Sequence, residues 1–184
     1  LLMRILILSN FYPPCDRGGY EQICEEVCTR LLARGHQIAV ITSDYLADQV
    51  PEETDVYRVL TLDSNLYHYQ PWDFFLNRRK NEKQNLKYLA SLLDRLQPDL
   101  FFVWGMWNLG RTLPAFVEQR GNPPVVFWLS DMWPAEPDMH FTFWRQPARQ
   151  PLLWLPRIIL GRMALTILAA ERKPIDLRFQ HVLC

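Results

Sequence analysis

The chain has 184 residues, about the length of one domain; 49% of them are hydrophobic and 22% are charged, which predicts a folded chain with a buried core. Its twenty basic side chains are balanced by twenty acidic ones, and this balance excludes the strongly basic surface typical of nucleic-acid-binding proteins. The uncharged apolar run at residues 163–170 is much shorter than the roughly 20 residues of a membrane-spanning helix, so we expect a cytoplasmic protein.

Short apolar runs alternate with longer amphipathic segments along the whole chain. The apolar runs predict buried strands at residues 3–9, 38–43, 56–62, 100–104, 125–129 and 181–184. Amphipathic segments predict helices over residues 20–34, 78–96, 109–120 and about 151–170. Residues 63–75 and 131–150 are expected to be irregular. This alternation predicts an α/β fold with a doubly wound, Rossmann-like parallel sheet.

Two of the four cysteines, Cys24 and Cys28, share one face of the first helix, and Ile23 and Leu32 are expected in the same apolar stripe. A metal site would need a Cys-x-x-Cys pair or nearby histidines, and neither accompanies these cysteines. We therefore expect reduced thiols packed in the core, and no metal.

In a parallel α/β sheet, ligands bind beyond the carboxyl ends of the strands. Gly18 and Gly19 occupy such a position, directly before the first helix, where glycine permits close approach to the free N–H groups of the helix. Their spacing matches neither G-x-G-x-x-G nor a Walker loop, which argues against a dehydrogenase. From the residues alone, a phosphate site and a plain tight turn are equally consistent with the pattern.

Several short sequences in the first 43 residues carry a family resemblance. The sequence YPP at residues 12–14, GG at 18–19 and Glu21 follow the first strand, and RGH at 34–36 precedes the second. Together they resemble the N-terminal domain of family 4 glycosyltransferases, which have the GT-B fold.

This resemblance implies transfer of a sugar from a nucleotide-sugar donor to a glycan or lipid-linked acceptor, with retention, as in polysaccharide biosynthesis for the cell envelope. It also implies that residues 1–184 are the acceptor-side domain, and that the C-terminal donor-binding domain is absent from this chain. Such a fragment is expected to be inactive alone. The donor is a substrate, and no cofactor is expected. The alternative is a non-catalytic module of the same fold that binds an acceptor or a partner.

The resemblance assigns the approach to the donor's phosphate and sugar to Gly18 and Gly19. Many relatives have a histidine at the end of the fifth strand, where this chain has Ser130 followed by Asp131. Ser130 cannot perform imidazole acid–base chemistry. We expect both residues at the catalytic centre, although Asp131 could instead cap the local turn.

Acceptor binding is expected from residues beside these loops, with core packing as the alternative for the two tryptophans. They are Arg17, Tyr20, Trp107 and Trp133. His68 and His140 lie in aromatic stretches that either bind a sugar or pack on the protein. Residues 141–170 combine Trp, Leu and Arg without any acidic residue, a pattern that suits either a membrane interface or a helix packed on the sheet.

Overall fold

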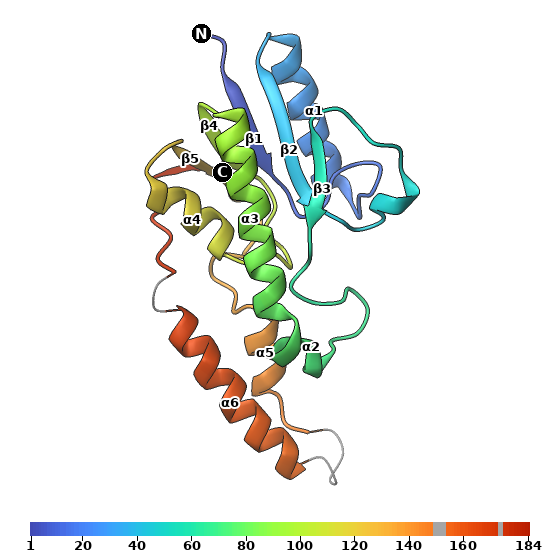
Figure 1. Cartoon of the computed structure of the whole chain (residues 1–184), viewed down its shortest axis with the longest axis vertical. Coiled ribbons are helices and arrows are strands. Elements are labelled where there is room, and N and C mark those ends of the chain that lie inside the picture. Colours follow the sequence, from blue (N-terminus) through green and yellow to red (C-terminus); the bar gives the residue numbers. More distant parts are fainter. Residues whose placement is uncertain (149–153, 173–174) are drawn as a thin grey trace.

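The computed structural model describes residues 1–148, 154–172 and 175–184, and its centre is a six-stranded sheet in the order β3-β2-β1-β4-β5-β6 (Figure 1). Every neighbouring pair of strands is parallel. The strands are β1 (Arg4–Leu8), β2 (Gln37–Ser43), β3 (Val56–Leu60), β4 (Leu100–Val103), β5 (Val125–Trp128) and β6 (His181–Leu183). The predicted doubly wound, Rossmann-like α/β fold is confirmed.

The helices are α1 (Gly19–Ala33), α2 (Pro71–Leu76), α3 (Arg78–Leu96), α4 (Thr112–Arg120), α5 (Met139–Arg145) and α6 (Trp154–Arg172), with a short 3-10 turn η1 (Ala47–Gln49). The prediction for residues 78–96 is confirmed. The helix after the fourth strand was expected to begin at residue 109, and this is wrong: it begins at Thr112. Residues 105–111 form a loop, in which Asn108 takes a left-handed conformation with φ 59°. The expected start of the last helix, near residue 151, lies outside the described residues.

The side chains of β1 alternate between two hydrophobic layers. Ile5 and Ile7 pack on the face covered by α1, and Leu6 and Leu8 pack on the face covered by α3 and α4. A strand in the middle of a parallel sheet is buried on both faces. This is why its sequence is a continuous apolar run.

The thiols of Cys24 and Cys28 are buried on the α1 face, as predicted, and all four cysteines are free. The prediction for Ile23 and Leu32 is wrong, since these side chains are 47% and 53% exposed. Because a helix turns by roughly 100° per residue, Ile23 and Leu32 lie on opposite edges of the apolar stripe that is centred on Cys24. At these edges the surface of α1 faces away from the sheet.

A helical extension, made of α2, α5 and α6, lies beyond the carboxyl ends of the strands (Figure 1). Its core contains Phe74, Trp144, Ala164 and Leu168. Two of its helices, α2 and α5, fall in stretches expected to be irregular. Their apolar side chains are covered because α6 packs over them. A contact with a distant segment leaves no pattern in the local sequence.

The first turn of α3 joins the helical extension to the sheet. Arg78 donates to the carboxylate of Glu171 on α6, and Arg79 donates to the same carboxylate at 3.0 Å.

Within the described ranges, no helix combines the length and the apolar character needed to cross a bilayer.

Candidate functional site

Residues that follow three different strands meet in one cavity at the carboxyl edge of the sheet, called here the glycine pocket. Its volume is about 360 Å³. It is lined by Asn10, Phe11, Arg17, Gly18, Gly19, Tyr20, Glu21, Gly105, Trp107, Ser130 and Asp131. Seven of the eight site residues expected from the sequence are in this set, and the eighth, Trp133, is not.

Gly18 and Gly19 form an open wall of the glycine pocket. Gly18 has an extended backbone with φ −178°, which any residue can adopt, and a Cβ at Gly19 would meet no atom within 4 Å. The fold itself therefore does not require glycine at position 19. Because no side chain caps the start of α1, the absence of side chains here leaves the N–H groups of its first turn accessible to a ligand.

The floor of the glycine pocket is a close contact between the loops after β1 and β4. A Cβ at Gly105 would lie 2.2 Å from Asn10 Oδ1, so this position requires glycine. Asn10 is 4% exposed, and its Oδ1 has no hydrogen-bond partner among the described residues. Asn10 was not among the site residues expected from the sequence, although a polar residue directly after a buried strand was the available signal.

Tyr20 and Trp107 form aromatic walls of different character. The Tyr20 hydroxyl donates to the Trp104 carbonyl, its ring stacks on Trp128 at 5.2 Å between centroids, and burial raises its pKa to about 12. Tyr20 is thus held by the protein itself. Trp107 is 43% exposed and contacts Phe11 at 6.1 Å between ring centroids, which leaves much of its surface available to a ligand.

Ser130 and Asp131 are exposed to the glycine pocket from the end of β5. Asp131 Oδ1 accepts a hydrogen bond from the Trp133 N–H at 3.0 Å, which is the turn cap considered from the sequence. This cap uses one carboxylate oxygen. Trp133 itself is 7% exposed and packs against Phe127 and Phe179, so its ring belongs to the core beneath the loop, where it also lines the second cavity described below.

Charge in the glycine pocket is mixed. Arg17 supplies the one cation of its lining, and Glu21 and Asp131 supply two carboxylates. Glu21 lies in the first turn of α1 and is only 6% exposed. Backbone N–H groups and Arg17 are the groups best suited to bind an anion here, whereas both carboxylates are suited to accept hydrogen bonds from sugar hydroxyl groups.

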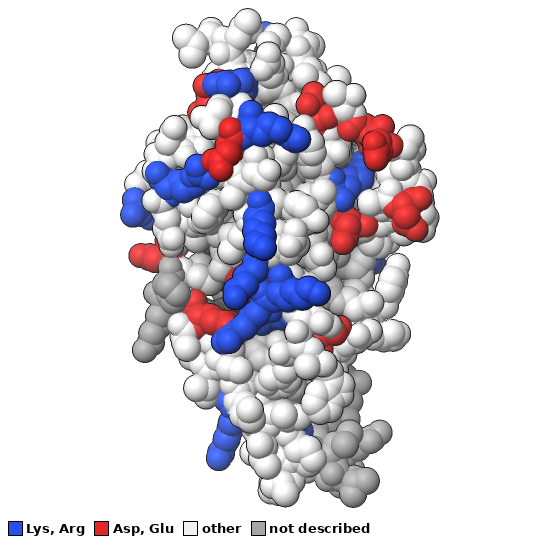
Figure 2. Space-filling view, viewed as in Figure 1, with Lys and Arg blue, Asp and Glu red and all other residues white. Residues whose placement is uncertain are grey.

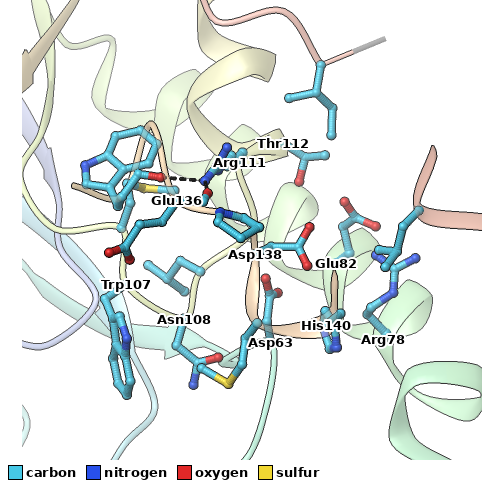
Figure 3. A pocket seen from close by; sticks show the side chains of 18 of the residues that line it. Asp63, Arg78, Glu82, Trp107, Asn108, Arg111, Thr112, Glu136, Asp138 and His140 are labelled. Atoms are coloured by element: carbon cyan, nitrogen blue, oxygen red, sulfur yellow. Dashed lines mark hydrogen bonds between the residues drawn. The ribbon is translucent and has the colours of Figure 1, made fainter. Parts of the chain in front are cut away.

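A second cavity, called here the acidic pocket, lies between the sheet and the helical extension and has a volume of about 440 Å³ (Figure 3). Its lining carries five carboxyl groups and two guanidinium groups: Asp63, Glu82, Glu136, Asp138 and Glu171, with Arg78 and Arg111. Trp107 lines both pockets. This cavity was not predictable from the sequence, because its carboxylates come from loops and helices that are distant in the sequence.

Two titratable groups of the acidic pocket have strongly shifted pKa values. Burial, together with the nearby Glu82 carboxylate, raises the pKa of Asp63 to about 7. Burial and the charge of Arg78 lower the pKa of His140 to about 4. His140 is therefore neutral at pH 7, and its Nδ1 lies 2.8 Å from the Tyr69 hydroxyl.

No group of three or more His, Cys, Asp or Glu residues is arranged to hold a metal ion in the parts of the chain that the structure describes.

The family comparison matches most of the chain. The sequence model of Glycosyltransferase Family 4 matches residues 17–171. The search of curated proteins found no match to this chain. Among solved structures, the chain is similar to the Bordetella bronchiseptica enzyme WbmH, crystallised in complex with NAD+, with 13% sequence identity and a TM-score of 0.38. The similarity covers 91% of this chain and 53% of the WbmH chain, so this chain spans about half the length of that protein.

The opposite pKa shifts of His140 and Asp63 predict opposing effects of pH on stability. His140 binds a proton more readily when unfolded, so its contribution to stability is full above pH 6.5 and is lost as the pH falls towards 4. Asp63 holds its proton more tightly when the protein is folded, so its contribution to stability increases as the pH falls from 7 towards 3.8. Between pH 7 and pH 5, the remaining His140 should lower the unfolding free energy of the Asp63→Asn variant by about 2 kcal/mol, and the remaining Asp63 should raise that of the His140→Gln variant by about 2 kcal/mol. The two variants should therefore differ by about 4 kcal/mol in their response to this acidification.

Urea unfolding of both variants and the unmodified chain at the two pH values measures this difference, because comparison within each variant removes any uniform loss of stability. The same pH dependence in all three proteins would contradict the prediction.

Proposed function

Because this chain belongs to glycosyltransferase family 4, we propose that it is the acceptor-side module of an enzyme that transfers a sugar from a nucleotide-sugar donor to a glycan or lipid-linked acceptor. The observation that carries this proposal is the meeting of Gly18 and Gly19 with Ser130 and Asp131 in one cavity. These residues come from the loops after β1 and β5, at the edge where parallel α/β sheets bind ligands.

The roles proposed within the glycine pocket follow from its chemistry. The N–H groups at the start of α1 are suited to contact the phosphate and sugar of the donor, since Gly18 and Gly19 have no side chains in the way. The Asp131 carboxylate and the Ser130 hydroxyl are suited to accept hydrogen bonds from an acceptor hydroxyl. Arg17, Tyr20 and Trp107 form the walls on which the acceptor would lie.

The nucleotide of the donor is proposed to bind mainly on a C-terminal domain that is not part of the 184-residue sequence, as the family resemblance implies. Transfer is proposed to retain the anomeric configuration, with no metal or cofactor. We propose no covalent nucleophile among the residues to which the glycine pocket assigns a role.

We also propose peripheral contact between α6 and the surface of a membrane, on the cytoplasmic side. Trp154, Leu155, Ile159 and Met163 are all more than half exposed on this helix. Figure 2 shows that Lys and Arg side chains also gather over α3; the exposed residues there include Lys80, Lys83 and Lys87. A helix with exposed apolar side chains, on a protein that also carries an exposed basic cluster, favours the interface of an anionic membrane, where a lipid-linked acceptor would be located.

Replacing Gly19 by Trp should abolish sugar transfer while leaving the fold intact. The open space at this position can hold the indole ring, which would then block the first turn of α1. Transfer is measured in the full-length gene product with labelled UDP- and GDP-sugars, and melting temperature is measured on the same samples. Glu26→Trp, on the exposed side of the same helix, is the matched control and should retain activity. Turnover by Gly19→Trp equal to that of the control would remove this loop from the active site.

Asp131→Asn separates the proposed chemical role of this residue from its role as a turn cap. The amide oxygen can still accept the Trp133 N–H, so the unfolding free energy should change by less than about 1 kcal/mol. Loss of the negative charge should lower kcat/KM by about tenfold or more. Full activity in Asp131→Asn, with losses of activity and melting temperature in parallel in Asp131→Ala, would make Asp131 a structural residue. A full-length product that binds glycans but transfers no sugar would instead support the non-catalytic module.

Replacing Ile159 by Glu should weaken binding to anionic vesicles by about tenfold, because the variant loses the transfer of one exposed Ile side chain into the interface. The measurement is co-sedimentation of the 184-residue chain with phosphatidylglycerol-containing vesicles at low salt. Ile23→Glu on α1 is the matched control, since this isoleucine is similarly exposed but lies on another helix. No sedimentation of the unmodified chain, or equal losses in both variants, would exclude α6 as the contact.

A further inference from the structure

We propose that the acidic pocket binds the ammonium group of an amino sugar, as a second subsite for the acceptor next to the glycine pocket. Calling the ligand an acceptor rests on the proposed function. Recognition of the ammonium group rests on the pocket alone.

The charge of the acidic pocket favours a cation. Glu171 is paired with both Arg78 and Arg79, and the Arg111 guanidinium donates to the carbonyls of Trp133 and Glu136. The cations of the lining are therefore already engaged by the protein. Among the described residues, no hydrogen bond or ion pair reaches the side-chain carboxyl groups of Asp63 and Glu82.

The carboxyl groups converge on one region of the cavity. Figure 3 shows Asp63, Glu82 and Asp138, from three different segments, directed towards the same space, with Thr112 across from them. Asp138 also accepts the Phe141 N–H at 2.7 Å as the N-cap of α5, which fixes its position. The mutual repulsion of these groups is relieved when a cation is bound between them.

A buried polar atom at the edge of the acidic pocket also lacks a partner. His140 is 4% exposed, and its Nε2 makes no hydrogen bond to any described residue. When Nδ1–H donates to the Tyr69 hydroxyl, Nε2 carries a lone pair that can accept an N–H or O–H group. Buried polar groups are normally paired, so this atom indicates that a ligand or water completes the site.

The shape of the pocket selects an organic ammonium group over a metal ion. The acids lack a metal-binding arrangement within the described residues, and the walls include the apolar side chains of Trp107, Leu109 and Leu168. An ammonium group donates three hydrogen bonds to carboxylates, and a sugar ring presents C–H groups to an aromatic face. Because Trp107 lines both pockets, a saccharide held in the glycine pocket can extend across this ring into the acidic pocket.

Calorimetric titration of the 184-residue chain with glucosamine, N-acetylglucosamine and glucose at pH 6 tests this assignment. We expect glucosamine to bind about tenfold more tightly than the two uncharged sugars, and Asp63→Asn to abolish that preference. Asp48→Asn, an exposed aspartate outside the pocket, is the matched control and should retain it. Glu82→Gln should weaken glucosamine binding independently and serves if Asp63→Asn does not fold.

Proton release gives a second readout that a structural role would not produce. Binding an ammonium group should expel the proton of Asp63, whose charged neighbours are Glu82, Arg78 and Asp138, with the neutral His140 in the same lining. Titrations at pH 6 in two buffers of different ionisation enthalpy should give nearly one released proton for the unmodified chain and none for Asp63→Asn.

Equal affinities for the three sugars, or an unchanged preference in both Asp63→Asn and Glu82→Gln, would overturn the proposal. Sugar transfer by the full-length gene product without amine preference would leave the proposed function standing and remove the subsite. Preferential binding of the amine by a full-length gene product that transfers no sugar would leave the subsite standing and remove the proposed function.

Discussion

The backbone of Asn10 joins the ends of three strands, and the glycine pocket is built on this junction. Its N–H donates to the Gly105 carbonyl at 3.0 Å, after β4, and its carbonyl accepts from the N–H and hydroxyl of Ser43, at the end of β2, at 3.3 and 2.5 Å. Because the strands are parallel, all of these ends lie at one edge of the sheet. The loops that start from this edge therefore reach one another without long connections.

The two pockets divide the carboxyl edge according to what covers it. The glycine pocket is built by loops and the first turn of α1, and no part of the helical extension lines it. The acidic pocket is closed from the other side by the helical extension, which removes water from Asp63 and His140 and shifts their pKa values in opposite directions. Trp107 lines both cavities and so connects the open one to the one that the helical extension covers.

Predictability from the sequence followed the range of the interactions. Strand β1 and helix α3 were predictable because an apolar run and a leucine stripe at helical spacing are local patterns. Helix α5 was not, since the burial of Trp144 depends on contact with α2 and α6. Residues Gly18, Gly19 and Asp131 were found because position after a strand predicts the edge of the sheet. Trp133 has the same position, but its indole ring packs into the core, and that direction depends on the space beside Phe127 and Phe179.

The sequence by itself determined the parallel α/β fold, the family, and the loops that could carry a site, because each of these depends on periodicity or on short motifs. Only the tertiary structure decided which side chains share a cavity. Asp63, Glu82 and Asp138 are separated by long stretches of chain and belong to a loop, a helix and a helix cap, and no pattern relates them. They meet because α5 packs on α6, and Arg78 and Arg79 at the start of α3 pair with Glu171 on α6. These contacts join segments that are far apart in the sequence, so they depend on the whole fold.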